Sequence, residues 1–398
     1  GLDGSDQIAR KFLDWLNDLE SPDNPGSYRN IDREVGGSVG PGFEPLPEGA
    51  DGTFALEGTD YLITRRLHEF YAATKRSGTD FIDGIEKAMG INIEELIESG
   101  KLTGVGLPNW EATGTDGCGA YLPFHAFAFS RKTPWGIYIF ADQLFAWTAS
   151  VWLKIGKKHS IEKLFELLFL VVYRHEMFHY HVERHAFMLE VSNRQPHYRP
   201  YVEKVRALVS NTEQWLEESL AQAVVLKSRF VKGKTTISAK EVKELLRAEF
   251  ATFGNGYKHF DCKWTGGVAQ GHRRLGTQIA RGMDVASALE WVTDLSIPKT
   301  EYTSDFAGVP GYLAWKQTTK SQFQFQTPKM QTTEKFWRSL GGQIDKKTAS
   351  SHERWTDKEG TNVQVVNRDG DIDLNSLKKM AKLFNTSTYQ LKKRIQGF

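Results

Sequence analysis

Residues 175–179 read HEMFH, and this pentapeptide constrains the chain more than any other stretch of its sequence. Two histidines four residues apart on a helix lie roughly 40° apart around its axis, so their imidazoles face the same side. His175 and His179 can therefore bind one divalent metal ion together. Glu176 lies about 100° from His175, on the flank where its carboxylate can take a proton from water.

The pentapeptide lies in the middle of a segment with helical periodicity, residues 160–192, that contains neither Gly nor Pro. A second helix is expected over residues 210–230, where Ser210 and Glu213 have the S-x-x-E form of a capping box. Two helices in succession can supply ligands to one metal ion.

A catalytic zinc site needs a third protein ligand, and the sequence offers two sources. His185 completes the spacing His-x3-His-x5-His, which resembles the metzincin pattern. That pattern needs a turn where this chain has Val182, and a β-branched residue seldom adopts positive φ. If the helix continues, His185 points about 80° away from His175. The other source is the acidic pair Glu217 and Glu218 in the second helix.

The run Glu218-Ser219-Leu220-Ala221-Gln222 has the E-x-x-A form that follows HExxH in one group of zinc peptidases. Here the chain resembles the gluzincin-type metallopeptidases, and loosely the small bacterial peptidases of the ImmA/IrrE group. The resemblance covers residues 120–230 and implies Glu218 as the third zinc ligand, with Glu217 as the alternative. Gln222 stands where the family has Asp or Asn, and its amide can still hydrogen-bond.

Two aromatic and β-branched runs, residues 120–129 and 135–140, precede the long helix and predict a pair of strands. In zincins an edge strand above the active-site helix binds the extended substrate, and the resemblance implies this role for residues 135–140. An edge strand can capture a peptide by strand addition. We therefore expect a peptide or protein substrate. Five later residues could include a hydrogen-bond donor to the reacting carbonyl: Tyr257, His259, His272, Tyr302 and Tyr312. For each one taken singly, a structural role is favoured.

The two cysteines, Cys118 and Cys262, are too few for a disulfide framework or a thiolate zinc site, so we expect His and carboxylate ligands. The first residues show no leader pattern. The longest apolar run, residues 164–173, is too short to span a bilayer. These features favour a cytoplasmic protein without a membrane segment.

The chain of 398 residues is long enough for several domains. We expect an N-terminal helix and extended loop over residues 1–58, a zincin-like domain over 59–316, a linker over 317–331 and a small domain over 332–398. The zincin-like domain should be mainly helical with a small antiparallel sheet, which makes the fold class α+β. Within it, residues 59–100 are expected to be helical and residues 254–275 to form a loop.

The C-terminal segment predicts the element order α-β-β-β-α and is basic, with 13 Lys and Arg against 8 Asp and Glu in residues 331–398. Around Ser351-His352 it resembles HicA-type toxin domains, whose fold is like that of double-stranded RNA-binding domains. The resemblance implies RNA as a partner of residues 332–398, His352 as the residue that serves RNA cleavage, and an antitoxin-like binding partner. Ser350 replaces the Gly of the family's G-S-H motif. A basic balance suits phosphate contacts.

Three hypotheses follow. The first is a zinc-dependent metallopeptidase with Glu176 as general base and a tail that binds RNA or recruits substrate. The second is a toxin-like RNA-binding or RNA-cleaving protein with an accessory metal domain. The third is a metal-stabilised interaction protein without catalysis.

Overall fold

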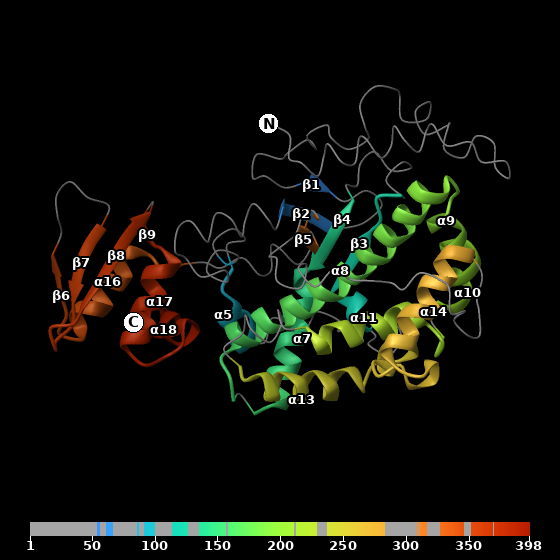
Figure 1. Ribbon diagram of the computed structural model, residues 1–398. Coiled ribbons are helices and arrows are strands. Elements are labelled where there is room, and N and C mark those ends of the chain that lie inside the picture. Colours follow the sequence, from blue (N-terminus) through green and yellow to red (C-terminus); the bar gives the residue numbers. More distant parts are fainter. Residues whose placement is uncertain are drawn as a thin grey trace, which may run out of the picture. The chain divides into compact units, whose positions relative to one another are not determined.

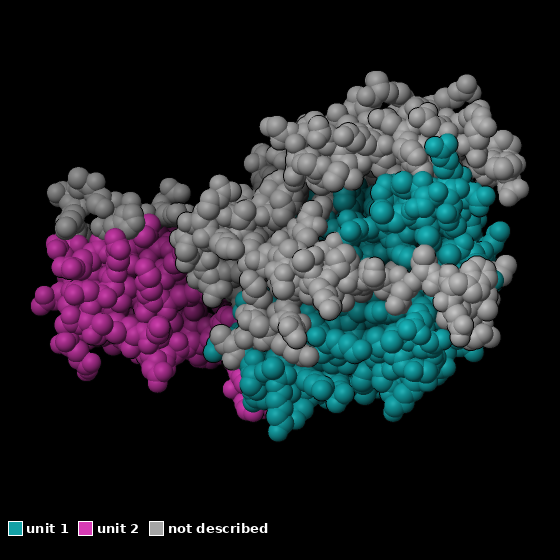
Figure 2. All heavy atoms as spheres, viewed as in Figure 1, with its two compact units in different colours: residues 1–69, 106–148, 163–317 teal, residues 70–105, 149–162, 318–398 magenta. Residues whose placement is uncertain are grey.

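The computed structural model describes residues 54–55, 61–66, 86, 91–99, 114–125, 135–156, 158–210, 212–228, 237–282, 309, 311–316, 327–345, 352–368 and 370–398. The chain divides into two compact units, coloured separately in Figure 2. Unit 1 comprises residues 1–69, 106–148 and 163–317, and unit 2 comprises residues 70–105, 149–162 and 318–398.

The sheet of unit 1 has the strand order β1-β2-β5-β4-β3. Its strands are β1 (Phe54–Ala55), β2 (Tyr61–Arg66), β3 (Gly119–Leu122), β4 (Gly136–Phe140) and β5 (Gly311–Lys316). All neighbours pair antiparallel except β4 and β5, which are parallel, so the sheet is mixed rather than antiparallel as expected. The helical prediction for residues 59–100 is wrong at β2, because Tyr61–Arg66 pairs with a strand about 250 residues later in the chain.

The two predicted strands before the long helix pair as β3 and β4, but β3 is shorter than the predicted run 120–129. It ends at Leu122, residues 123–125 are not strand, and residues 126–129 lie outside the described residues. The expectation that residues 135–140 form the edge strand is wrong, because β4 lies between β3 and β5. Within the part of the chain that the structure describes, β3 forms the edge. The order of strands depends on β5, which no local pattern before the helix reveals.

The long helix α8 (Ile161–Asn193) confirms the helical prediction for residues 160–192. It follows α7 (Ala141–Lys154) and runs beside β3 and β4 (Figure 1). The second helix, α11 (Leu216–Lys227), begins later than predicted, since Ser210 instead ends the short helix α10 (Ala207–Val209). The capping-box geometry occurs further on, where Ser238 and Glu241 cap α13 (Ala239–Phe250).

Residues 254–275 are not all loop, contrary to the prediction. They contain the short helices η5 (Asn255–His259) and η6 (Lys263–Thr265) and the start of α14 (Val268–Arg281). Two glycines inside α14 hide its periodicity, and one of them, Gly271, lies close to α11: a Cβ there would be 3.0 Å from Leu220 Cδ2.

One apolar cluster holds the helices of unit 1 together. It joins α8, α11 and α14 to α9 (Tyr198–Tyr201) and the π-helical turn η4 (Val202–Arg206), and its members include Phe178, Val182, Leu220, Val224, Leu275 and Ile279. Burial of such side chains contributes about 1.5–3 kcal/mol each. The cluster fixes α11 against the face of α8 that carries the HEMFH pentapeptide.

The strand β3 is tied to α8 by a buried carboxylate, that of Glu183. It accepts hydrogen bonds from the Tyr121 hydroxyl, from Phe124 N at 3.0 Å and from His125 N at 2.7 Å. The imidazole of His125 bridges Glu183 (2.6 Å) and Glu190 (2.8 Å). Burial lowers the pKa of His125, but the two carboxylates outweigh it and raise the pKa to about 9.

This bridge makes stability depend on pH. His125 binds its proton more tightly in the folded protein (pKa about 9) than in the unfolded chain (about 6.5), so the stabilisation is complete below about pH 6.5 and is lost as pH rises through about 9. The bridge stabilises the folded protein by at most about 3 kcal/mol. We expect the difference in urea-unfolding free energy between wild type and His125→Gln to shrink from pH 6 to pH 10.

The control for this prediction is His259→Gln, because His259 pairs with Glu213 near the surface, where the two side chains are 33% and 58% exposed. A surface pair contributes little, so that variant should stay close to wild type at both values. A His125→Gln penalty that does not change between pH 6 and pH 10 would contradict the bridge.

Unit 2 contains the expected order of helix, three strands and helix, with additions. Its elements are α16 (Met330–Ser339), β6 (Gln343–Asp345), β7 (His352–Thr356), β8 (Asn362–Arg368), β9 (Asp371–Ile372), α17 (Leu374–Leu383) and α18 (Thr388–Gln396). The four strands form an antiparallel sheet, and the apolar side chains of the strands and helices share one core around Trp337 and Trp355.

Unit 2 also includes a segment from far earlier in the chain. Helix α5 (Ile93–Glu98) packs against α18, and Glu95 forms a buried ion pair with Lys392 at 2.8 Å. Thr388 N donates to Glu94 at 3.0 Å, and Lys378 pairs with Glu86. The C-terminal helices therefore depend on carboxylates that come before η2 (Gly114–Gly117), α8 and α11, the elements of the metal site, in sequence.

The described elements make the fold class α+β, as the sequence predicts: helices dominate, beside one mixed and one antiparallel sheet. None of the helices in the described ranges combines the length and the apolar character that crossing a bilayer requires. Of the predicted N-terminal helix and extended loop over residues 1–58, the structure describes only Phe54–Ala55, as β1. Residues 317–326 of the predicted linker also lie outside the described residues.

Candidate metal centre

Helix α8 brings the two histidines of the pentapeptide together. Because a helix turns once every 3.6 residues, His175 and His179 project from the same side, and their Nε2 atoms lie 3.3 Å apart. Both side chains are buried. Phe178 and Val182, on the neighbouring side of the helix, belong to the apolar cluster and prevent α8 from rotating.

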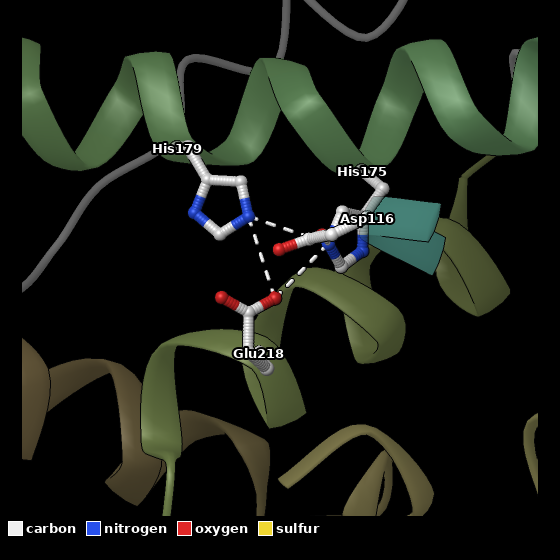
Figure 3. A group of neighbouring side chains, drawn as sticks. All are labelled: Asp116, His175, His179 and Glu218. Atoms are coloured by element: carbon white, nitrogen blue, oxygen red, sulfur yellow. Dashed lines mark hydrogen bonds and ion pairs between the residues drawn. The ribbon is translucent and has the colours of Figure 1, made fainter. Parts of the chain in front are cut away.

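Two carboxylates complete the group, one from α11 and one from the turn before β3 (Figure 3). Glu218 Oε2 lies 3.0 Å from Nε2 of His175 and 3.4 Å from Nε2 of His179. Asp116 Oδ1 lies 2.8 Å from Nε2 of His175. One ligand atom from each of the four side chains lies within 4.8 Å of all the others.

These separations suit a single ion. Ligands about 2.0–2.1 Å from a tetrahedral zinc are about 3.3 Å from one another. The two imidazole nitrogens and the Glu218 oxygen have separations of 3.0, 3.3 and 3.4 Å. The group of Asp116, two histidines and Glu218 could therefore hold a metal ion.

The Glu218 carboxylate gives independent support for a cation. Both of its oxygens are buried, and among the described residues neither has a hydrogen bond of good geometry, although Nε2 of His175 is close. A buried carboxylate without such compensation is strongly unfavourable. A positive ion between the imidazoles would balance the negative charge of the carboxylate and accept the lone pairs of the imidazole nitrogens. The residues therefore fit a metal such as zinc.

Glu217, the alternative ligand, has a different position. It faces the far side of the His179 ring, where it accepts a hydrogen bond from Nδ1 at 2.6 Å. The Tyr201 hydroxyl donates to its other oxygen at 2.6 Å, and Arg206 lies 3.8 Å away. Burial raises the pKa of Glu217, but Arg206 and His179 outweigh it and lower the pKa. The charged carboxylate keeps the proton on Nδ1 and leaves Nε2 to face the group.

Asp116 is the residue that the sequence does not predict. It lies in the 3-10 turn η2 (Gly114–Gly117), and the Tyr257 hydroxyl donates to its Oδ2 at 3.0 Å. Gly114 has φ +49°, and a Cβ there would be 2.4 Å from the Tyr257 ring. The only sequence signal is a single acid in a glycine-rich run directly before a strand, which does not reveal that the turn meets α8.

Glu176 is buried beside the group, and its Oε1 has no hydrogen-bond partner among the described residues. Burial, with a further contribution from Asp116, raises the pKa of Glu176 to about 8. Gly119 of β3 lies against it, since a Cβ at Gly119 would be 3.1 Å from Glu176 Oε1 and 2.5 Å from Val172. The missing side chain lets β3 approach this carboxylate.

The remaining predicted residues lie elsewhere. Helix α8 continues past Val182, and His185 is not a member of the ligand group found among the described residues. Of the donor candidates, Tyr257 reaches the group, whereas His259 pairs with Glu213, His272 stacks on Phe178 and Tyr312 stacks on Tyr138.

Two of the predicted residues cannot be placed in a site. Tyr302 is outside the described residues. His352 is the first residue of β7 and its backbone pairs with Val366, but its side chain is outside the description, as are Ser350 and Ser351.

Comparison of the chain with protein-family models, with curated proteins and with solved structures found no match. The chain is therefore assigned to no family.

Metal binding should depend steeply on pH. Burial lowers the pKa of His175, but the nearby carboxylates of Asp116 and Glu218 outweigh it and raise the pKa to about 9. The pKa of His179 is likewise raised, by Glu218 and Glu217 against the effect of burial. A metal must displace these protons. We expect the apparent zinc affinity to rise by about tenfold or more per pH unit from pH 6 to about pH 9.

Competition with a chelator of known proton affinity, at pH 6, 7, 8 and 9, measures this dependence. His175→Ala should bind zinc more weakly at every pH and show a flatter dependence. An affinity of the wild-type protein that does not change with pH would count against imidazole ligation.

Proposed function

We propose that the protein is a zinc-dependent hydrolase of peptide bonds, with Glu176 as general base. The observation that carries the proposal is the convergence of two α8 imidazoles and the buried Glu218 carboxylate next to the buried carboxylate of Glu176. His175, His179 and Glu218 would hold the ion. When bound, zinc acidifies water and polarises a carbonyl.

Glu176 supplies the proton transfers. A general base works best when its pKa is near the working pH, and the pKa of about 8 meets that condition. The carboxylate takes a proton from the attacking water and returns it to the leaving amine. Because Gly119 has no side chain, β3 approaches this carboxylate closely.

The strand β3, which ends the sheet among the described strands, supports a peptide as the substrate. Phe140 N donates to Cys118 O at 2.8 Å, so in the antiparallel register the backbone groups of Ala120 also face β4. The alternate residues, Gly119 and Tyr121, then turn their backbone N–H and C=O groups away from β4. An extended peptide can pair with those groups by strand addition, directly beside Glu176.

The substitution Glu176→Gln tests the proposed chemistry. The amide keeps the shape of the side chain but cannot accept a proton, so we expect peptide hydrolysis to fall by about 10²–10⁴-fold. Zinc content and unfolding temperature should stay within the range of wild type, because Glu176 is not among the four grouped ligand side chains.

Glu244→Gln, at an exposed position of α13, is the matched control and should hydrolyse peptides like wild type. Wild-type turnover of a quenched-fluorescence peptide library by Glu176→Gln would remove Glu176 from its role. Zinc-loaded wild-type protein that cleaves no member of the library would count against the function itself.

A second candidate function is RNA binding by unit 2, favoured by exposed cations on its three C-terminal helices: Lys335, Arg338, Lys379, Lys382, Lys393 and Arg394. Each lysine that contacts a phosphate adds about one to the slope of log affinity against log salt concentration. RNA cleavage through His352 and an antitoxin-like partner remain further expectations of the same resemblance to HicA.

We expect the triple variant Lys335→Gln, Lys379→Gln, Lys382→Gln to bind structured RNA more weakly and to flatten the salt slope by about two to three. The matched control removes three exposed lysines of unit 1, Lys227, Lys240 and Lys243, and changes the net charge equally. Filter binding from 50 to 300 mM salt measures both slopes. Equal slopes in the two variants would contradict specific phosphate contacts by unit 2.

A further inference from the structure

We infer that Asp116 is a fourth protein ligand, which closes the metal site in the substrate-free protein and leaves the ion when a substrate binds. The ligand assignment is independent of the proposed function, whereas the release by substrate rests on it. The number of ligands distinguishes two kinds of zinc site. Catalytic zinc sites keep three protein ligands and one open position, while sites with four protein ligands are closed and structural.

The group found here has four possible protein ligands, the number that is typical of a closed site. Asp116 Oδ1 lies 2.8 Å from the His175 Nε2 that also faces Glu218, and within 4.8 Å of the ligand atoms of His179 and Glu218 (Figure 3). As a fourth ligand it would take the position that a catalytic zinc ion keeps open. Water or a substrate carbonyl would need that same position. As long as Asp116 holds it, the ion has no place for a reacting group.

Asp116 differs from the other three in how it is held. His175, His179 and Glu218 project from packed helices, and their side chains are at most 3% exposed. Asp116 projects from the four-residue turn η2, and its side chain is 29% exposed. It is therefore the one ligand of this group that can move towards solvent without unpacking a helix.

The turn is nevertheless built to aim the carboxylate at the ion. The Tyr257 hydroxyl binds Oδ2 at 3.0 Å, which leaves Oδ1 for the metal. Gly114 packs flat on the Tyr257 ring, and Gln222 of α11 donates to the Thr115 hydroxyl. These three contacts fix the position of Asp116, which would be unnecessary for a surface acid.

The turn also leads directly into the strand that a peptide would pair with. Asp116 lies three residues before Gly119, and Cys118 N donates to Thr115 O at 2.8 Å. A peptide on the β3 edge thus reaches the group at the position of Asp116, and the two compete for the ion. Displacement of Asp116 frees the Tyr257 hydroxyl to donate to the oxygen that develops negative charge.

Cobalt(II) in place of zinc tests the ligand assignment in the full-length chain, because its visible spectrum responds to a change of ligand. Wild type should show a spectrum that added azide does not alter. Asp116→Ala should show a shifted spectrum that responds to azide, and its zinc affinity should fall at least tenfold. Asp116→Asn can still accept the hydrogen bond from the Tyr257 hydroxyl, and it replaces the alanine variant in this test if that variant is unstable. Asp261→Ala, at an exposed turn, is the control and should match wild type.

Identical cobalt spectra, azide responses and zinc affinities in wild type and Asp116→Ala would overturn the assignment, as would azide binding to wild type. Peptide turnover per bound zinc tests the release. A severalfold rise in Asp116→Ala supports a closing role, and a fall overturns it. If the spectra differ as expected but neither protein cleaves peptides, Asp116 remains a ligand, and both the release step and the proposed hydrolysis fail.

Discussion

The carboxylate of Glu218 is buried between two imidazoles of α8, and the architecture of unit 1 depends on this contact. A charge in that position is tolerated only with a compensating charge and well-placed dipoles. The metal ion that this group could hold would supply the charge, while Glu217 fixes the ring of His179 from behind, and Tyr201 and Arg206 support Glu217 in turn. The apolar cluster around Phe178 and Leu220 then holds α8 and α11 at the required separation.

The parts of this arrangement that could be predicted from sequence are those with a local cause. Helix α8 has uninterrupted periodicity, so both its extent and the shared face of His175 and His179 follow from the helical repeat. The E-x-x-A motif favours Glu218 over Glu217, and it is Glu218 whose oxygen lies near both Nε2 atoms. Without that motif, two adjacent acids at the start of one helix would have been equivalent candidates.

What could not be predicted depends on contacts between distant segments. Asp116 reaches the group because a glycine turn lies against the ring of Tyr257, about 140 residues later in the chain. The inner position of β4 depends on its pairing with β5 in the same way. Helix α14 has no clear sequence signal because Gly271, which lowers helix propensity, is where α14 approaches Leu220 closely. Tertiary packing overrides the local preference at each of these places.

The docking of α5 on α18 has a practical consequence for dissecting the molecule. A chain cut near residue 331 would strip Glu86, Glu94, Glu95 and Glu98 of partners that lie after the cut, among them Lys378, Thr388 and Lys392. The shortened protein would then expose carboxylates that have lost these ion pairs and hydrogen bonds. Poor solubility caused by them could be mistaken for the loss of a function of the C-terminal segment. Excision of the C-terminal segment should therefore be matched by neutralising those four acids.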